Sequence, residues 1–256
     1  MDQNQSKNKK KKEMSFLQHL EELRWCLIKS VLAVVIGMLC AFPLSGYIID
    51  ILTLPNNNLA NPPEMVFLKP AGMLLVRMGV SITAGIIVAF PVIFYQIWKF
   101  ISPALLSKER KIIWPVVTFS TLCFLLGISF AYFVMLPFIL PFLYSLGTET
   151  IKPTINVSEY IGFSVQIILV AGLVFELPVA SFVLTKIGLL SPKILRKYRR
   201  YGIIIIFILS AFLTPPDPGS QVLLAVPLLV LYEISIGISV LAYRKRKKQE
   251  ELLAAS

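Results

Sequence analysis

The stretch Gly172-Leu-Val-Phe-Glu-Leu-Pro-Val-Ala180 places a carboxyl group and a proline inside a long apolar run. That run, from Tyr160 to Thr185, is long enough at about 1.5 Å per residue to cross a bilayer as a helix. Glu176 lies near its middle, where inserting an ionisable side chain costs about 3 kcal/mol. Pro178 cannot donate a hydrogen bond to the carbonyl group of Val174, so it loosens the helix beside the acid.

Two interpretations of Glu176 stay open. In the first, the acid contacts a partner helix, for which Gly172 and Ala180, one turn to either side on the same face, leave room. In the second, the acid is hydrogen bonded to a neighbouring helix of the same chain and serves packing alone. Its depth in the apolar run favours the functional interpretation.

The composition of the chain is typical of a membrane protein with several spans. Of its 256 residues, 56% are hydrophobic and only 15% are charged, which is too apolar for a soluble domain. The net charge of +11 could also indicate nucleic-acid binding. However, 22 of the 25 Lys and Arg residues fall in four clusters between apolar segments, at residues 7–29, 99–111, 186–200 and 244–248. The positive-inside rule then places both termini in the cytoplasm, and no nucleic-acid partner is needed.

The apolar segments predict an all-α integral membrane protein of the cell inner or plasma membrane, with six transmembrane helices and both termini cytoplasmic. We expect residues 1–13 to be a disordered basic tail, 14–243 a single six-helix membrane domain, and 244–256 a cytoplasmic tail. Residues 14–24 are expected to form a separate amphipathic helix on the cytoplasmic surface. The spans are expected near residues 25–45, 80–98, 112–136, 160–185, 201–213 and 221–243.

The last two spans are predicted to be short. Tyr201–Leu213 has 13 residues, which is about 20 Å of helix against a hydrocarbon core of about 30 Å. The sixth span carries Glu233, 11 residues before Arg244, while Glu176 lies 10 residues before Lys186. Because both helices run towards the cytoplasm, the two carboxyl groups are expected at similar depth. Glu176, Pro178 and Glu233 are therefore predicted to form an intramembrane polar site or partner contact.

Residues that could carry catalysis or bind a metal are scarce. The three cysteines, Cys26, Cys40 and Cys123, lie in or beside apolar segments and have no metal-ligand spacing, and His19 is the single histidine. The sequence contains neither H-E-x-x-H nor G-x-S-x-G. We therefore predict no catalytic residues, no metal and no cofactor, and a protein that is not an enzyme.

Eight stretches follow one another in an order that resembles the TatC family, the multi-span receptor of the twin-arginine protein translocase. The resemblance covers residues 14–243. One position departs from the family, because Cys26 stands where many members carry a second basic residue. The stretches are His19-Leu-Glu-Glu-Leu-Arg24, Pro91-Val-Ile-Phe-Tyr-Gln-Ile-Trp98, Phe100-Ile-Ser-Pro-Ala-Leu105 with Glu109-Arg110, Ala131-Tyr-Phe133, Phe175-Glu-Leu-Pro178, Leu213-Thr-Pro-Pro-Asp217, Ser220-Gln221 and Leu231-Tyr-Glu233.

The resemblance implies a receptor that binds twin-arginine signal peptides of folded cargo proteins at the cytoplasmic face. It also implies assembly with small single-span partners of the TatA and TatB type, self-association, contact with membrane lipid, and export driven by the proton-motive force. Asp217 and Gln221 would belong to an outer-loop site. The signal-peptide site would comprise Glu22, Arg24, Phe100, Pro103, Glu109 and Arg110.

The charges of the cytoplasmic face agree with an arginine-binding role for two of these acids. A face carrying so many basic groups repels an arginine-rich ligand unless local acids offset the field. A carboxylate such as that of Glu22 or Glu109 can hold a guanidinium by two parallel hydrogen bonds, which an ammonium cannot reproduce. The alternatives are a surface ion pair of Glu109 with Arg110 or Lys108, and a solvated helix charge for Glu22. Loop packing explains Phe100 and Pro103 nearly as well as peptide contact does.

The main alternative function is a proton-coupled small-solute transporter, in which Glu176 and Glu233 form a carrier site or proton relay. Transporters of that kind usually contain internal repeats with interrupted helices at matching positions. Residues 25–111 and 157–243 show no such correspondence, so the receptor interpretation is favoured.

Overall fold

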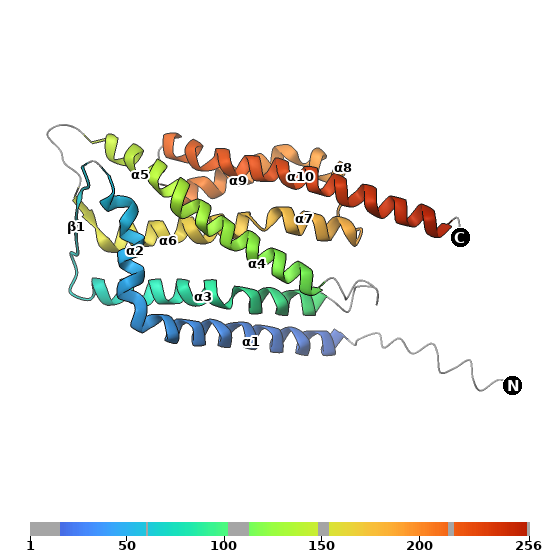
Figure 1. Cartoon of the computed structure of the whole chain (residues 1–256), viewed down its shortest axis with the longest axis horizontal. Helices are drawn as coiled ribbons and strands as arrows, with labels where there is room; N and C mark the ends of the chain where they lie inside the picture. The colour runs from blue at the N-terminus through green and yellow to red at the C-terminus, as the bar shows by residue number, and fades with distance from the viewer. Residues whose placement is uncertain (1–15, 60, 102–112, 148–153, 215–217, 255–256) are drawn as a thin grey trace.

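The computed structural model describes residues 16–59, 61–101, 113–147, 154–214 and 218–254. Over these residues the chain forms long helices that run along one axis, with a two-stranded β pair at one end (Figure 1). We call this end the strand end. The helix α1 (Phe16–Ala41) begins, and α10 (Pro218–Ala254) finishes, at the opposite end, which we call the terminal end.

Helix α1 is continuous from Phe16 to Ala41, so the predicted boundary between a surface helix and the first span is wrong. The segment contains no proline, and nothing in it interrupts the helical hydrogen bonds. It packs along α3 (Gly72–Ile101), where the two backbones approach closely. A Cβ atom on Gly37 would lie 2.9 Å from the carbonyl oxygen of Gly85. Small residues at this crossing therefore set the separation of the first two spans.

The strand end is built from a helix and two short strands that lie between the long helices. A 3-10 turn, η2 (Phe42–Leu44), leads into α2 (Ser45–Asn57), which continues through Pro55. Strand β1 (Glu64–Val66) pairs in parallel with β2 (Thr154–Asn156), with Glu64 opposite Thr154. No strand was predicted, because three residues are too few to show the alternation that identifies one.

The third span is longer than predicted. Helix α4 (Ile113–Phe130) passes through a π-helical segment, η5 (Ala131–Met135), into α5 (Leu136–Ser145). The span was expected to end near residue 136, but the helix continues past Pro137 and Pro141 to Ser145. Pro137 falls in the first turn of α5, directly after the π-helical segment, where a missing N–H is tolerated.

The fourth span is interrupted where Pro178 was expected to loosen it. Helix α6 (Val157–Val174) ends two residues before α7 (Leu177–Lys186), and Phe175 and Glu176 form the turn between them. The Asn156 side chain caps α6 by accepting a 3.0 Å hydrogen bond from the backbone N–H of Ser158. The acid of this span therefore sits at a helix break.

The last two helices differ in length. After the short α8 (Pro192–Lys197), α9 (Arg199–Leu213) has 15 residues, and its predicted shortness is confirmed. The same prediction is wrong for α10, which runs for 37 residues. Beyond Tyr243 the chain is rich in Arg, Lys, Gln, Glu, Leu and Ala and contains no Gly or Pro, so the helix continues past the apolar part.

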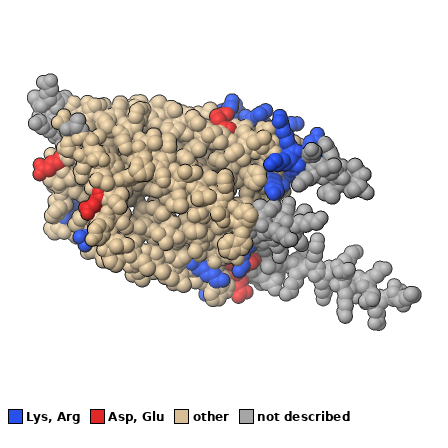
Figure 2. Space-filling model, viewed as in Figure 1, with Lys and Arg blue, Asp and Glu red and all other residues tan. Residues whose placement is uncertain are grey.

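The length and hydropathy of the helices identify a multi-pass membrane protein. Among the described residues, five helical segments could cross a bilayer, and α9 is not one of them. Figure 2 shows a broad band free of Lys, Arg, Asp and Glu across the face in view, with charges towards both ends. The largest fully buried apolar side chains are Phe124, Leu136, Ile139, Leu140, Ile167, Leu224 and Leu228. The five segments are His19–Asn57, Gly72–Phe100, Trp114–Ser145, Val157–Lys186 and Pro218–Lys247.

Candidate functional site

At the terminal end, Glu22 lies on α1 with one carboxylate oxygen enclosed. The Oε2 atom is shielded from solvent and makes no hydrogen bond to any residue that the structure describes. The Glu22 side chain as a whole is half-buried, with 25% of its surface exposed. A buried acceptor without a donor costs free energy, so a donor that displaces the groups now shielding this oxygen would gain a hydrogen bond there.

His19 and Phe100 complete this cluster. The imidazole of His19 stacks on the Phe100 ring of α3, with ring centroids 4.2 Å apart and an interplanar angle of 13°. Its Nδ1 atom lies 4.0 Å from Oε2 of Glu22, one helical turn further along α1. Glu22 and Phe100, both predicted site residues, thus lie on either side of one histidine. No role was predicted for His19, although its i, i+3 spacing from Glu22 places the two side chains on one helix face.

Arg24 is exposed on α1, and the structure gives it no hydrogen bond or ion pair with another described side chain. Its role in the signal-peptide site therefore stays a prediction. The predicted site residues Pro103, Glu109 and Arg110 lie outside the described residues. The structure thus positions half of the proposed site, contributed by α1 and the end of α3.

Glu176, at the break between α6 and α7, is buried, with 7% of its surface exposed. Its carboxyl group lies beside Ser120 and Cys123 of α4. Neither carboxyl oxygen has a well-formed hydrogen bond to a described residue, and the same holds for the Ser120 hydroxyl. Burying unpaired polar groups in membrane-spanning helices costs free energy. The Glu176 carboxyl group and the Ser120 hydroxyl can therefore form hydrogen bonds with a polar group that approaches the helix bundle.

Glycines bring α4 and α6 together close to this acid. A Cβ atom on Gly127 would lie 2.8 Å from the Cα atom of Gly172, and one on Gly172 would meet the Phe124 ring at 2.6 Å. Gly172 was predicted to lie on a small-residue face that leaves room for another backbone. In the structure the helix that takes this space is α4 of the same chain.

Glu233 faces a different helix from Glu176. The hydroxyls of Thr185 on α7 and Ser239 on α10 lie 2.7 Å apart. Counting back from this pair places Glu176 and Glu233 within about one helical turn in depth, as expected. Glu233, however, is about half exposed and accepts a hydrogen bond from Arg199 of α9. Glu176 thus lies beside α4 and Glu233 beside α9, and a joint partner contact of the two acids stays a prediction.

Gln221 of α10 forms a hydrogen bond with the backbone of α9. Its Nε2 donates a 3.1 Å hydrogen bond to the carbonyl oxygen of Phe207, and Gln166 of α6 does the same for Phe212 at 3.2 Å. These amides connect α9 to α6 and α10. The predicted outer-loop site stays a prediction, and Asp217 lies outside the described residues.

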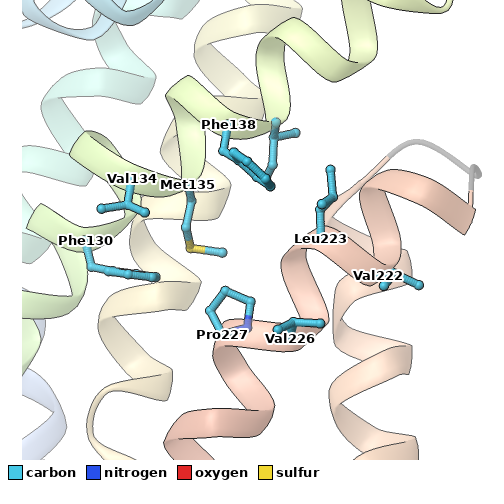
Figure 3. Close-up of a pocket in the computed structure, with 9 residues that line it drawn as sticks. Phe130, Val134, Met135, Phe138, Val222, Leu223, Val226 and Pro227 are labelled. Carbon is cyan, nitrogen blue, oxygen red and sulfur yellow. The ribbon is translucent and has the colours of Figure 1, made fainter.

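An apolar groove of about 300 Å³ separates the third span from the beginning of α10. Figure 3 shows the side chains of the third span facing those of α10 across the groove. The lining contains no charged or polar side chain, so the groove offers shape but no hydrogen bonds. The lining residues are Phe130, Val134, Met135, Phe138, Ile139, Val222, Leu223, Val226 and Pro227.

Comparison with known proteins finds close similarity over most of the chain. The family model of the Sec-independent protein translocase protein (TatC) matches residues 18–227. The TatC protein of Aquifex aeolicus (strain VF5) is 41% identical over 237 residues, covering 92% of this chain and 98% of its own length. The TatCy protein of Bacillus subtilis (strain 168) is 37% identical over 246 residues, covering 92% of each.

Solved structures agree with this. A crystal structure of the twin-arginine translocase receptor TatC has a TM-score of 0.79 and 40% identity, covering 88% of this chain and 99% of that chain. A second, of the receptor in DDM, has a TM-score of 0.81 and 41% identity, covering 86% and 99%. The family match, the relatives and the shared fold lead to one conclusion: the chain belongs to the TatC family of Sec-independent protein translocase proteins, which are transport components and not enzymes.

Proposed function

We propose that this protein binds twin-arginine signal peptides at its terminal end, which faces the cytoplasm. Glu22 and Glu109 bind the two guanidinium groups, with Arg24 and Arg110 orienting the acids and Phe100 and Pro103 giving apolar contact. The observation that carries this proposal is the enclosed Oε2 atom of Glu22, which has no donor among the described residues. A guanidinium supplies paired N–H donors that match a carboxylate.

The test is the affinity of the purified receptor for a labelled twin-arginine peptide. Glu22→Gln keeps the shape of the side chain and removes its charge, and Glu21→Gln is the matched control because Glu21 is an exposed acid on the same helix turn. A charge-assisted hydrogen bond contributes about 1.5–3 kcal/mol, so Glu22→Gln should weaken binding by at least about tenfold. Equal affinity of the two variants would refute the assignment.

The proposed membrane topology has six spans, with both termini in the cytoplasm and α9 as the fifth span. Support comes from the terminal end, where α1 begins and α10 finishes (Figure 1), and from the basic residues of α8 and the end of α10. In a cysteine-free background, Ser191→Cys should react with an impermeant thiol reagent only from the cytoplasmic side, and Asn61→Cys only from the outer side of the inner membrane. The reverse pattern would contradict the proposal.

The proposed partners are single-span proteins of the TatA and TatB type, with which the receptor exports folded proteins at the expense of the proton-motive force. Glu176 and Ser120 support such a contact, because both are buried polar groups without a well-formed hydrogen bond among the described residues. Self-association and contact with membrane lipid belong to the same proposal. Glu176 and Glu233 face different helices, so nothing in their geometry favours the solute-transporter alternative.

A further inference from the structure

We propose that His19 is a positioning residue that keeps the carboxylate of Glu22 ready for an arginine of the signal peptide. This inference rests on the proposed function, in which Glu22 binds the peptide. It assigns a role to a side chain that contacts Glu22 and Phe100, two of the three described residues of the site.

The first observation is the stack between His19 and Phe100. Their rings lie nearly parallel, 4.2 Å between centroids, and come from α1 and the last turn of α3. A ring stacked on a neighbouring helix has less rotational freedom than one on an isolated helix. The imidazole is therefore held in place from the α3 side, although 43% of its surface is exposed.

The second observation is the enclosure of Oε2 of Glu22. This oxygen lies 4.0 Å from Nδ1 of His19, which is too far for a direct hydrogen bond. It is nevertheless shielded from solvent and makes no hydrogen bond within the described residues. The imidazole thus lies beside the oxygen without taking up its capacity to accept a hydrogen bond.

The two observations together suggest how an exposed helix end selects arginine. A glutamate on a free helix surface is fully hydrated, and a ligand must displace that water to bind it. Because Oε2 of Glu22 is already shielded from water, a donor that reaches this oxygen does not first have to displace bound water, and the net free energy of the hydrogen bond is more favourable. A guanidinium presents a planar pair of N–H groups to a carboxylate held in one orientation, and an ammonium does not.

The experiment is a double-mutant cycle on the full-length receptor, measured as the affinity for a labelled twin-arginine peptide, with thermal melting in detergent to verify folding. His19→Ala should weaken binding about fivefold to tenfold, the scale of one hydrogen bond. In the Glu22→Gln background the same substitution should change affinity by less than about twofold, because the residue acts through Glu22. His19→Phe, which can keep the stack on Phe100, should retain more affinity than His19→Ala.

Two results would overturn the inference while leaving Glu22 in the site. One is an unchanged affinity in His19→Ala, and the other is an equal loss in both backgrounds, which would indicate a general effect on the fold. If Glu22→Gln itself leaves the affinity unchanged, the proposed function fails and this inference fails with it. The four variants therefore separate an error in the role of His19 from an error in the site.

Discussion

The hydroxyl group of Tyr132 donates a 2.7 Å hydrogen bond to the carbonyl oxygen of Ile51. Ile51 lies four residues before Pro55, which sits inside α2 and has no N–H to offer that carbonyl group. The next carbonyl group, of Leu52, accepts a 2.9 Å hydrogen bond from the Tyr160 hydroxyl. Tyrosines of the third and fourth spans therefore supply donors to the turn of α2 in which Pro55 leaves a carbonyl group without its helical donor.

This relationship predicts that Tyr132→Phe lowers the free energy of unfolding by about 1–3 kcal/mol, because a carbonyl group loses its donor in an apolar setting. Denaturation in detergent micelles measures the effect, with Tyr47→Phe as an exposed control. Pro55→Ala restores an N–H to α2, so in that background the cost of Tyr132→Phe should fall below about 1 kcal/mol. A cost that is the same in both backgrounds would show that the tyrosine does not compensate for the proline.

A second prediction concerns the crossing of α4 and α6. Gly127→Ala would bring a methyl group within 2.8 Å of backbone atoms of α6, so it should destabilise the protein by about 1–3 kcal/mol. Gly162→Ala is the control, since a Cβ there meets nothing within 4 Å. Because alanine favours the helix more than glycine does, Gly162→Ala should leave the free energy of unfolding unchanged or raise it by up to about 1 kcal/mol. Similar melting temperatures for the two variants would argue against a tight crossing.

The third prediction separates the two intramembrane acids. Glu176→Gln keeps a hydrogen-bond donor and acceptor, so it should retain most crosslinking to single-span partners and most transport. Glu176→Ala should lose both, and Glu233→Gln should stay close to the parent because an exposed ion pair contributes little. Equal, severe loss in Glu176→Gln and Glu176→Ala would instead indicate that the acid must titrate.

The length of α9 gives a fourth prediction. Fifteen residues span about 22 Å, so this side of the molecule should be thinner than the bilayer. Inserting four leucines after Ile205 should impair transport while the protein still enters the membrane. The same insertion after Lys247, in the basic part of α10 that follows Tyr243, should be tolerated. Full transport by the α9 variant would contradict a role for the short helix.

Much of the fold could be predicted from the sequence, because apolar length and the distribution of Lys and Arg are strong signals. The break beside Glu176 followed from Pro178, and the shortness of α9 followed from its 13 apolar residues. The predicted end of the third span was wrong, because Pro137 alone does not indicate that a π-helical segment precedes it and that the helix continues. The β pair was missed because residues 64 and 154 meet only through the folding of distant spans.

The site was predictable only in part. Glu22 and Phe100 came from family stretches, and the structure places them around one histidine. The enclosure of a single carboxylate oxygen depends on the packing around that atom, which no sequence spacing specifies. Likewise, Glu176 and Glu233 were grouped by depth alone. The depth of a residue along a helix does not specify the direction in which its side chain points. In the structure, Glu176 lies beside α4 and Glu233 beside α9.

The most direct test of the central claim is the discrimination between arginine and lysine by the purified receptor. Affinities for a twin-arginine peptide and for its Lys–Lys counterpart should be measured at several salt concentrations, for the parent and for Glu22→Gln/Glu109→Gln. We predict that the parent prefers the arginine peptide by at least about tenfold, and that the double variant binds both peptides weakly and nearly equally. A double variant that binds the twin-arginine peptide as tightly as the parent does would contradict the account.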